Sequence, residues 1–175
     1  MTNGLIHLYH GNGKGKTSAA IGLAIRAAGN HMKVVFLQFL KGSPSGEIQI
    51  MKDIPTIKVL RNSTDLGFVS NMTSDELGIL REMHDSNLAT AISLVESGQC
   101  DLLVLDEVCA AYRLNVVNHS LIDELVVNKP AALELVLTGR EPCDLFIRQA
   151  DYITLMSKVR HPYDKGIPAR HGIEY

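Results

Sequence analysis

The chain has 175 residues, of which 46% are hydrophobic and 21% charged, and its formal net charge at pH 7 is −2. This length and composition fit one globular domain over residues 1–175 with a buried core, and the near-neutral charge gives no reason to expect nucleic acid or an anionic membrane as a partner. No apolar run approaches the length of a membrane span, the first residues do not form a signal peptide, and the cysteines show no disulfide or zinc-site spacing, so we expect a cytoplasmic protein.

The first predicted elements are a strand over residues 5–9 and a helix over residues 19–28, joined by a glycine-rich run. A strand, a tight turn and a helix in this order are typical of a phosphate-binding loop. Backbone N–H groups and the helix start would hold phosphate, Lys16 would reach the outer phosphates, and the Thr17 hydroxyl would bind Mg²⁺. The residues expected to contact a nucleoside triphosphate are Gly11, Asn12, Gly13, Lys14, Gly15, Lys16, Thr17 and Ser18.

Two features of this loop depart from the general phosphate-loop pattern. His10 stands where the pattern has glycine, and Lys14 adds a second lysine inside the turn. The extra positive charge suits a highly charged polyphosphate, although Lys14 could equally point into solvent. A glycine-rich turn that binds nothing would leave the clustered glycines, lysines and threonine unexplained.

Further apolar, β-rich runs alternate with helical patterns along the rest of the chain. Their near-continuous apolar character indicates strands covered on both faces, and hence a parallel sheet. A long helix follows the capping box from Thr73 to Glu76, a shorter one follows Asn118, and another is expected to start at Pro142. We therefore expect a layered α/β fold with about six mostly parallel strands and a ligand site beyond their carboxyl ends. The later strands are expected at residues 34–39, 57–60, 102–105, 133–137 and 152–155.

Polar side chains follow several of these strands on the edge where the glycine-rich loop is expected. Asp106 and Glu107 end an apolar strand, and an acid at this place in phosphate-loop proteins holds Mg²⁺ beside the loop threonine. An exposed acidic turn is the alternative. Lys41 and Arg140 end two other strands; Arg140 there could contact a phosphate or a ribose, or be a surface arginine beside a turn.

The C-terminal segment, residues 158–175, is polar and rich in proline and glycine. A disordered basic tail is the default interpretation of such a segment. The tyrosines and isoleucines between its charges would instead suit a loop packed over a site.

Seven short motifs stand out in chain order: residues 11–17 (GNGKGKT), 38–42 (QFLKG), 105–107 (LDE), 137–140 (LTGR), 150–154 (ADYIT), 161–166 (HPYDKG) and 172–175 (GIEY). Together they closely resemble the motifs of the ATP:corrinoid adenosyltransferases of the phosphate-loop type, also called cob(I)yrinic acid a,c-diamide adenosyltransferases. The resemblance covers residues 5–175. It implies a three-layer phosphate-loop NTPase fold of the RecA-like kind, a homodimer, and transfer of the 5′-deoxyadenosyl group of ATP to cobalt(I) of a corrinoid with release of triphosphate.

The resemblance also implies roles for individual residues. Cobalt(I) is itself a strong nucleophile, so catalysis would consist of positioning and of charge stabilisation by Lys14, Lys16 and Mg²⁺ on Thr17 and Glu107. Asp106 would orient the metal or its waters. Phe68 matches a family residue near the corrin, whereas the tryptophan that some members place shortly after it is absent. Val69 or Met72 would then cover the corrin. Lys41 and Arg140 complete the set of residues predicted to bind ligand. A flavin-dependent electron donor is the expected redox partner.

Two other functions compete with this one. A small phosphate-loop kinase or ATPase would act on the γ-phosphate. It would need a residue that positions water or a lid that binds the phosphate acceptor, and the sequence shows no motif for either. A non-catalytic corrinoid sensor would carry an Asp-x-His-x-x-Gly stretch, and the chain has none. The transferase is therefore the function that the sequence favours.

Overall fold

A six-stranded parallel sheet forms the centre of the computed structural model, which describes residues 3–62, 67 and 69–174. The strand order is β3-β2-β4-β5-β1-β6, and every neighbouring pair runs parallel. The predicted sheet of about six strands is confirmed, with all strands parallel. The strands are β1 (Ile6–His10), β2 (Val34–Gln38), β3 (Ile57–Arg61), β4 (Leu102–Asp106), β5 (Glu134–Gly139) and β6 (Tyr152–Leu155).

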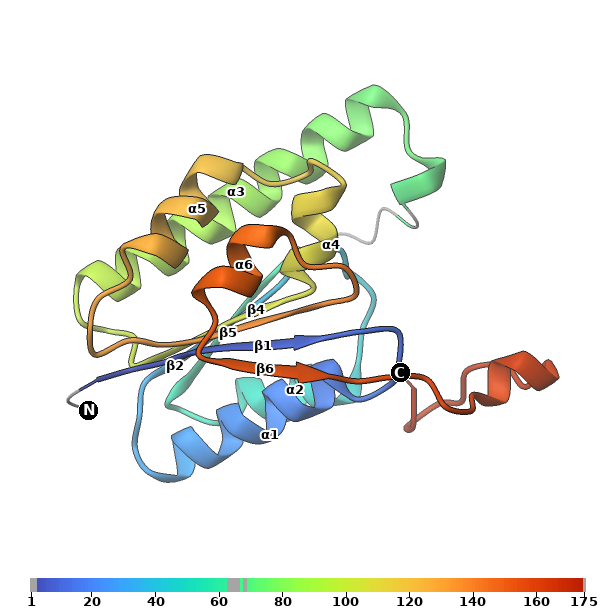
Figure 1. The fold of residues 1–175 in the computed structure, drawn as a ribbon, viewed down its shortest axis with the longest axis horizontal. Coiled ribbons are helices and arrows are strands. Elements are labelled where there is room, and N and C mark those ends of the chain that lie inside the picture. Colours follow the sequence, from blue (N-terminus) through green and yellow to red (C-terminus); the bar gives the residue numbers. More distant parts are fainter. Residues whose placement is uncertain (1–2, 63–66, 68, 175) are drawn as a thin grey trace.

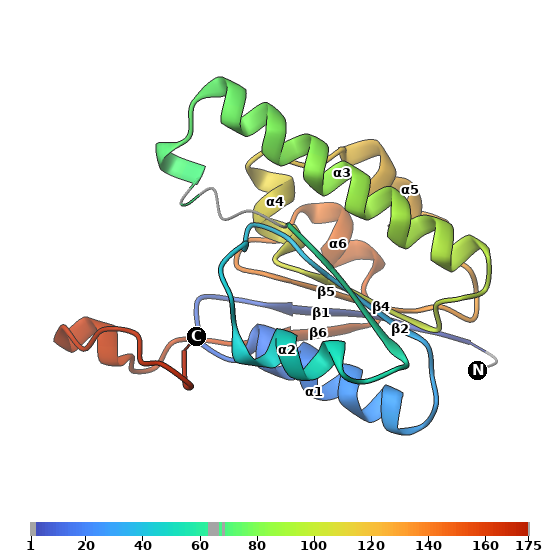
Figure 2. The ribbon, with the colours of Figure 1, turned by 180° about the vertical axis from the view of Figure 1, so that it is seen from behind.

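Helices cover both faces of this sheet and complete a three-layer α/β fold (Figure 1). On one face lie α1 (Lys16–Gly29) and α2 (Gly46–Lys52), as the reverse view also shows (Figure 2). The opposite face carries α3 (Ser74–Glu96), α4 (Val108–Arg113), α5 (His119–Val127) and α6 (Asp144–Gln149). The predicted α/β class is confirmed, and its arrangement is that of a phosphate-loop NTPase-like fold.

The helices that the sequence predicts are present, with some differences in where they begin. The capping box is present, because the Thr73 hydroxyl accepts from the Glu76 N–H and the Glu76 carboxylate accepts from the Thr73 N–H. Helix α1 begins at Lys16, earlier than residue 19, so Lys16 and Thr17 occupy its first turn. The apolar spacing does not predict helices α2 and α4, because helices of seven and six residues contain too few turns to show a period.

Strand β6 contradicts the expectation that the strands are covered on both faces. It is an edge strand that pairs with β1 alone, and Tyr152, Ile153 and Leu155 are 51%, 48% and 62% exposed. An apolar run reports hydrophobic composition but does not report where in the sheet the strand lies. The sequence therefore predicted the strand correctly and its burial wrongly.

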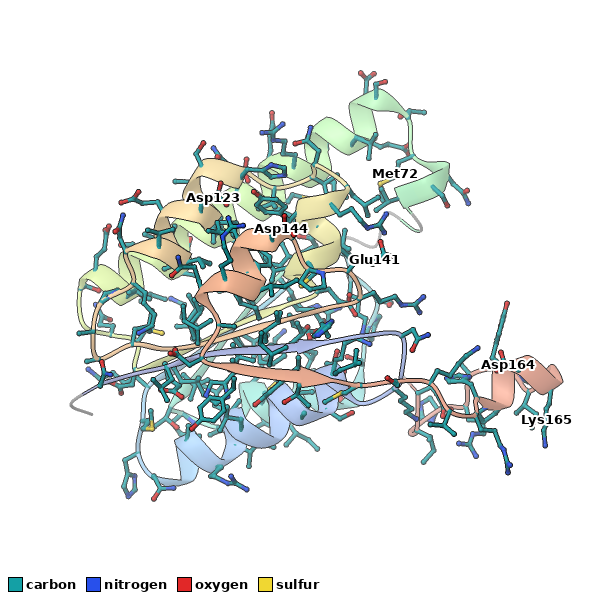
Figure 3. The ribbon with its side chains drawn as sticks, in the orientation of Figure 1. Met72, Asp123, Glu141, Asp144, Asp164 and Lys165 are labelled. Atoms are coloured by element: carbon teal, nitrogen blue, oxygen red, sulfur yellow. The ribbon has the colours of Figure 1, made fainter. Side chains whose placement is uncertain are left out.

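After β6 the C-terminal segment (residues 156–174) extends beyond the end of the sheet and then turns back (Figure 1). Its outer end is a 3₁₀ turn, η2 (Pro162–Lys165), where Asp164 and Lys165 lie far from the sheet (Figure 3). A second 3₁₀ turn, η1 (Val69–Asn71), precedes α3. Among the described residues, no helix is long and apolar enough to cross a membrane.

Candidate active site

The glycine-rich loop (residues 11–15) joins β1 to α1 at the carboxyl edge of the sheet. Gly11 and Gly15 have φ angles of +113° and +115°, a conformation that side chains disfavour. The Gly13 N–H donates to the Met156 carbonyl at 2.7 Å, and a Cβ on Gly13 would lie 2.7 Å from that same oxygen. Glycine is thus required where the loop passes against the chain that follows β6.

Lys16 is a nearly buried cation inside this loop, with 8% of its surface exposed. Its Nζ donates to the carbonyls of Gly11 and Gly13, both at 2.8 Å. Burial lowers the pKa of Lys16, and the negative charge of nearby Glu107 opposes that effect. The loop therefore holds a positive charge at the start of α1, where the helix dipole is also positive.

Asp106 connects the elements that meet at the site. This fully buried residue ends β4, and its Oδ1 accepts from the hydroxyls of Thr17 at 3.0 Å and Thr138 at 2.8 Å. Its Oδ2 accepts from Gln38 Nε2 at 3.0 Å. Three donors from α1, β5 and β2 thus satisfy the carboxylate and fix it directly beneath the Thr17 hydroxyl.

Glu107 follows Asp106 in a left-handed conformation, with φ of +61°, which is uncommon for a residue other than glycine. Its N–H donates to the Thr138 hydroxyl at 2.9 Å. Burial raises the pKa of Glu107 and the charge of Asp106 raises it further, whereas Lys41, Lys16 and Arg140 lower it. The Glu107 carboxylate therefore lies close enough to three cationic side chains to interact with them electrostatically.

These residues surround a cavity of about 680 Å³, a volume in the range of small-molecule sites. Most of the residues predicted to bind ligand line it: Asn12, Gly13, Lys14, Gly15, Lys16, Thr17, Ser18, Lys41, Glu107 and Arg140. Gly11 lies outside the lining, and Asp106 sits behind Thr17. Phe68 falls outside the described residues, and Val69 and Met72 pack against the hydrophobic core.

Part of the cavity wall comes from residues that the sequence did not single out. Helix α2 contributes Glu47 and Ile50, and α1 contributes Ile21. Their only sequence signal is the three-residue spacing of Glu47 and Ile50, which is weak in a helix of seven residues.

The C-terminal segment forms the remaining wall through His161 and residues 172–174. Lys158 N–H donates to Asn12 Oδ1 at 2.9 Å, and Lys14 Nζ lies 2.8 Å from Glu174 Oε1. Of the two interpretations of this segment, a loop at the site agrees with the structure and a free tail does not.

Comparison with known proteins identifies the family. Residues 2–175 match the family profile described as ATP:corrinoid adenosyltransferase BtuR/CobO/CobP. A corrinoid adenosyltransferase of Pseudomonas aeruginosa is 32% identical over 98% of this chain and 84% of its own length. Corrinoid adenosyltransferases of Escherichia coli and of a Sinorhizobium species are 27% and 29% identical, again over 98% of this chain, and over 86% and 80% of their own lengths. The chain belongs to the ATP:corrinoid adenosyltransferase family.

Proposed function

We propose that this chain, acting as one domain over residues 1–175, transfers the 5′-deoxyadenosyl group of ATP to the cobalt(I) of a corrinoid. The electron pair of cobalt(I) forms the new bond to C5′, and the bond from C5′ to the phosphate oxygen breaks with its pair remaining on triphosphate. Cobalt formally becomes cobalt(III), and no proton has to move. Family membership makes the chain an adenosyl-transferring enzyme, and the observation that carries the assignment to this cavity is the buried Lys16 beside the Thr17–Asp106 pair.

Charge stabilisation of the leaving triphosphate is the main task that we assign to the side chains. Lys14, Lys16, Lys41 and Arg140 line one cavity, and Lys16 is already held in place by the loop carbonyls. Lys14, Lys41 and Arg140 are exposed, whereas Lys16 is nearly buried. A buried, preorganised cation stabilises developing negative charge far better than a cation in bulk solvent does. Lys14 and Lys16 are the residues that we expect to contribute most to the rate, together with Glu107.

The donors at Thr17, Asp106 and Glu107 fit a magnesium ion. All three supply hard oxygen atoms, which Mg²⁺ prefers. Thr17 and Glu107 line the cavity and would hold the ion, whereas Asp106, which accepts from the Thr17 hydroxyl at 3.0 Å, would orient the ion or its waters. When bound, the ion would neutralise charge on the phosphate chain.

A kinase or ATPase that acts on the γ-phosphate is not favoured. The family match extends over residues 2–175, well beyond the loop that all phosphate-loop enzymes share. We further propose a cytoplasmic homodimer that receives electrons from a flavin-dependent donor, with no role for nucleic acid or a membrane.

The proposal is tested with chemically reduced cob(I)alamin, ATP and Mg²⁺, by following the corrin spectrum and the phosphate products together. We expect light-sensitive adenosylcobalamin to accumulate one-for-one with triphosphate. ADP and phosphate with an unchanged corrinoid would contradict the proposal and identify a hydrolase or kinase.

A further inference from the structure

A histidine in the middle of α3 contacts the turn that brings Lys41 to the cavity. His84 is fully buried, its Nδ1 lies 2.8 Å from the Val116 carbonyl oxygen, and its Nε2 lies 3.2 Å from the Leu40 backbone nitrogen. A carbonyl oxygen can only accept, so Nδ1 carries the ring proton and donates it to Val116. Nε2 of the neutral ring is then an acceptor, and it is shared by the Leu40 N–H and by the side-chain amide nitrogen of buried Asn62, which lies 3.3 Å away.

The turn at Leu40 needs such support. Leu40 has φ of +62°, a left-handed conformation that is strained for a branched side chain. The preceding amide, of Phe39, donates to the Asp106 carbonyl at 3.0 Å, and the Phe39 ring meets the His84 ring edge-on with centroids 5.1 Å apart. Two consecutive N–H groups are therefore fixed, one to the end of β4 and one to α3.

Lys41 is the next residue after this turn, and it lines the cavity. Glu107 lines the same cavity, and the positive charge of Lys41 lowers the pKa of Glu107, so the two side chains interact electrostatically. The direction in which the Lys41 side chain leaves the backbone is set by the conformation of Leu40. His84 itself does not line the cavity.

We propose that His84 is a positioning residue for Lys41. By accepting the Leu40 N–H it holds the left-handed turn, and the turn places the Lys41 ammonium group where it meets the phosphate chain of the nucleotide. The identity of that ligand rests on the function proposed above.

Two amide substitutions separate positioning from packing. Both His84→Gln and His84→Asn remove the ring and leave a neutral polar side chain. Glutamine is long enough to present its Oε1 to Leu40 in place of Nε2, whereas asparagine reaches only the position of Nδ1. We expect ATP to bind about tenfold more weakly to His84→Asn than to the native protein, and His84→Gln to recover most of this loss, as measured by isothermal titration calorimetry. Equal losses in the two variants would overturn the proposal.

The same pair in a Lys41→Ala background tests whether His84 acts through Lys41. We expect His84→Asn and His84→Gln to bind ATP equally well once Lys41 is gone. If the two His84 variants still differ as much in ATP affinity when Lys41 is absent, His84 does not act through Lys41.

If a His84 variant does not fold, a backbone ester at Leu40 provides the same test. The ester replaces the N–H by oxygen and leaves His84 and the core unchanged. We expect it to weaken ATP binding about as much as His84→Asn, and unchanged affinity would overturn the proposal.

Measuring ATP binding keeps this inference distinct from the proposed reaction. If the native protein binds ATP but forms no adenosylated corrinoid, the reaction is wrong and the contrast between the two amides still decides the role of His84. If transfer occurs and the contrast is absent, only the role of His84 is wrong. A native protein that does not bind ATP would overturn both.

Discussion

The Lys14 ammonium and the Glu174 carboxylate lie 2.8 Å apart although 160 positions separate them in the chain. Their ion pair joins the glycine-rich loop to the returning end of the C-terminal segment. Glu174 also accepts from Arg170, and hydrogen bonds from Arg170 and Lys14 lower the pKa of Glu174 to about 2. The carboxylate therefore remains charged at any pH at which the protein would work. In the function proposed above, it would compete with the phosphate chain of ATP for Lys14.

Glu174→Gln should strengthen ATP binding. The substitution removes the charge that holds Lys14, and exposed ion pairs of this kind are weak, so we expect affinity to rise by at most about fivefold. The gain should shrink as salt is added, because screening already weakens the pair in the native protein. Titration calorimetry at low and high salt measures both effects. Weaker ATP binding by Glu174→Gln would mean that Glu174 supports the ligand site and does not compete with it.

Lys16→Ala should reduce adenosyl transfer by about 10²- to 10³-fold, the range seen when one preorganised donor to developing negative charge is removed. Lys16 is nearly buried, is held by the carbonyls of Gly11 and Gly13 and lines the cavity, whereas Lys14 and Lys41, which also line it, are exposed. Lys58→Ala is the matched control, because Lys58 is exposed on β3 and does not line the cavity. Initial rates of adenosylcorrinoid formation give the comparison, and equal rates for both variants would remove Lys16 from the mechanism.

Glu107→Gln should raise stability and lower activity. Burial and the charge of Asp106 raise the pKa of Glu107, so ionising this carboxyl group is less favourable in the folded protein than in the unfolded chain. This unfavourable contribution is fully present above the folded pKa of Glu107. It is lost progressively as the pH falls from the folded pKa to the ordinary glutamate value of about 4.3, below which the carboxyl group is neutral in both states. Thermal melts in a metal chelator should therefore show a higher melting temperature for the variant at neutral pH, and the difference should narrow toward acidic pH. A lower melting temperature throughout would show that the charge stabilises the fold.

Gly139→Ala should destabilise the fold, because the new Cβ would lie 2.4 Å from the Cβ of Cys109 and φ at this position is +152°. Overpacking of this kind costs about 1–3 kcal/mol of the free energy of unfolding. Gly78→Ala is the control: Gly78 lies within α3 with nothing within 4 Å of its added Cβ. The control should gain about 0.5–1 kcal/mol, because alanine favours a helix interior over glycine. Denaturant unfolding of both variants checks the pair, and a Gly139→Ala variant as stable as the native protein would show that Cys109 can move aside.

Acidification should destabilise the native protein partly through His84. Burial lowers the pKa of His84, while the hydrogen bond to Val116 and the charge of Asp85 oppose the shift. The unfolded chain therefore takes up this proton first, and stability is lost as the pH falls below about 6.5, the ordinary histidine value. The free energy of unfolding of His84→Gln should fall less steeply between about pH 7 and pH 5. Parallel pH profiles for the two proteins would show that His84 does not titrate differently on folding.

The parts of the site that the sequence predicted are those encoded by local pattern. Lys16 and Thr17 stand at fixed places in a strand–loop–helix unit, and Asp106 and Glu107 end an apolar strand, so parallel strand order alone brings them to one edge. The structure places these residues together as expected, and their catalytic and metal-binding roles stay predictions.

The parts that the sequence missed depend on tertiary contacts. Glu174 reaches the loop only because the chain turns back after β6, and a contact across 160 positions leaves no periodic signal. His84 lies on the buried face of α3 between Leu80 and Leu88, where spacing identifies a core position. Its bond to Leu40 depends on how α3 crosses the end of β2, which spacing does not encode.

In the proposed reaction, the bond between C5′ and the bridging oxygen of the α-phosphate breaks, the oxygen leaves with triphosphate, and C5′ forms a bond to cobalt. This reaction is tested most directly with ATP that carries ¹³C at C5′ and ¹⁸O in the oxygen that bridges C5′ to the α-phosphate. We expect the corrinoid product to show a ¹³C signal from carbon bonded to cobalt and the triphosphate to retain all of the ¹⁸O. Products in which ¹⁸O stays attached to ¹³C in ADP, with no carbon bonded to cobalt, would contradict the account.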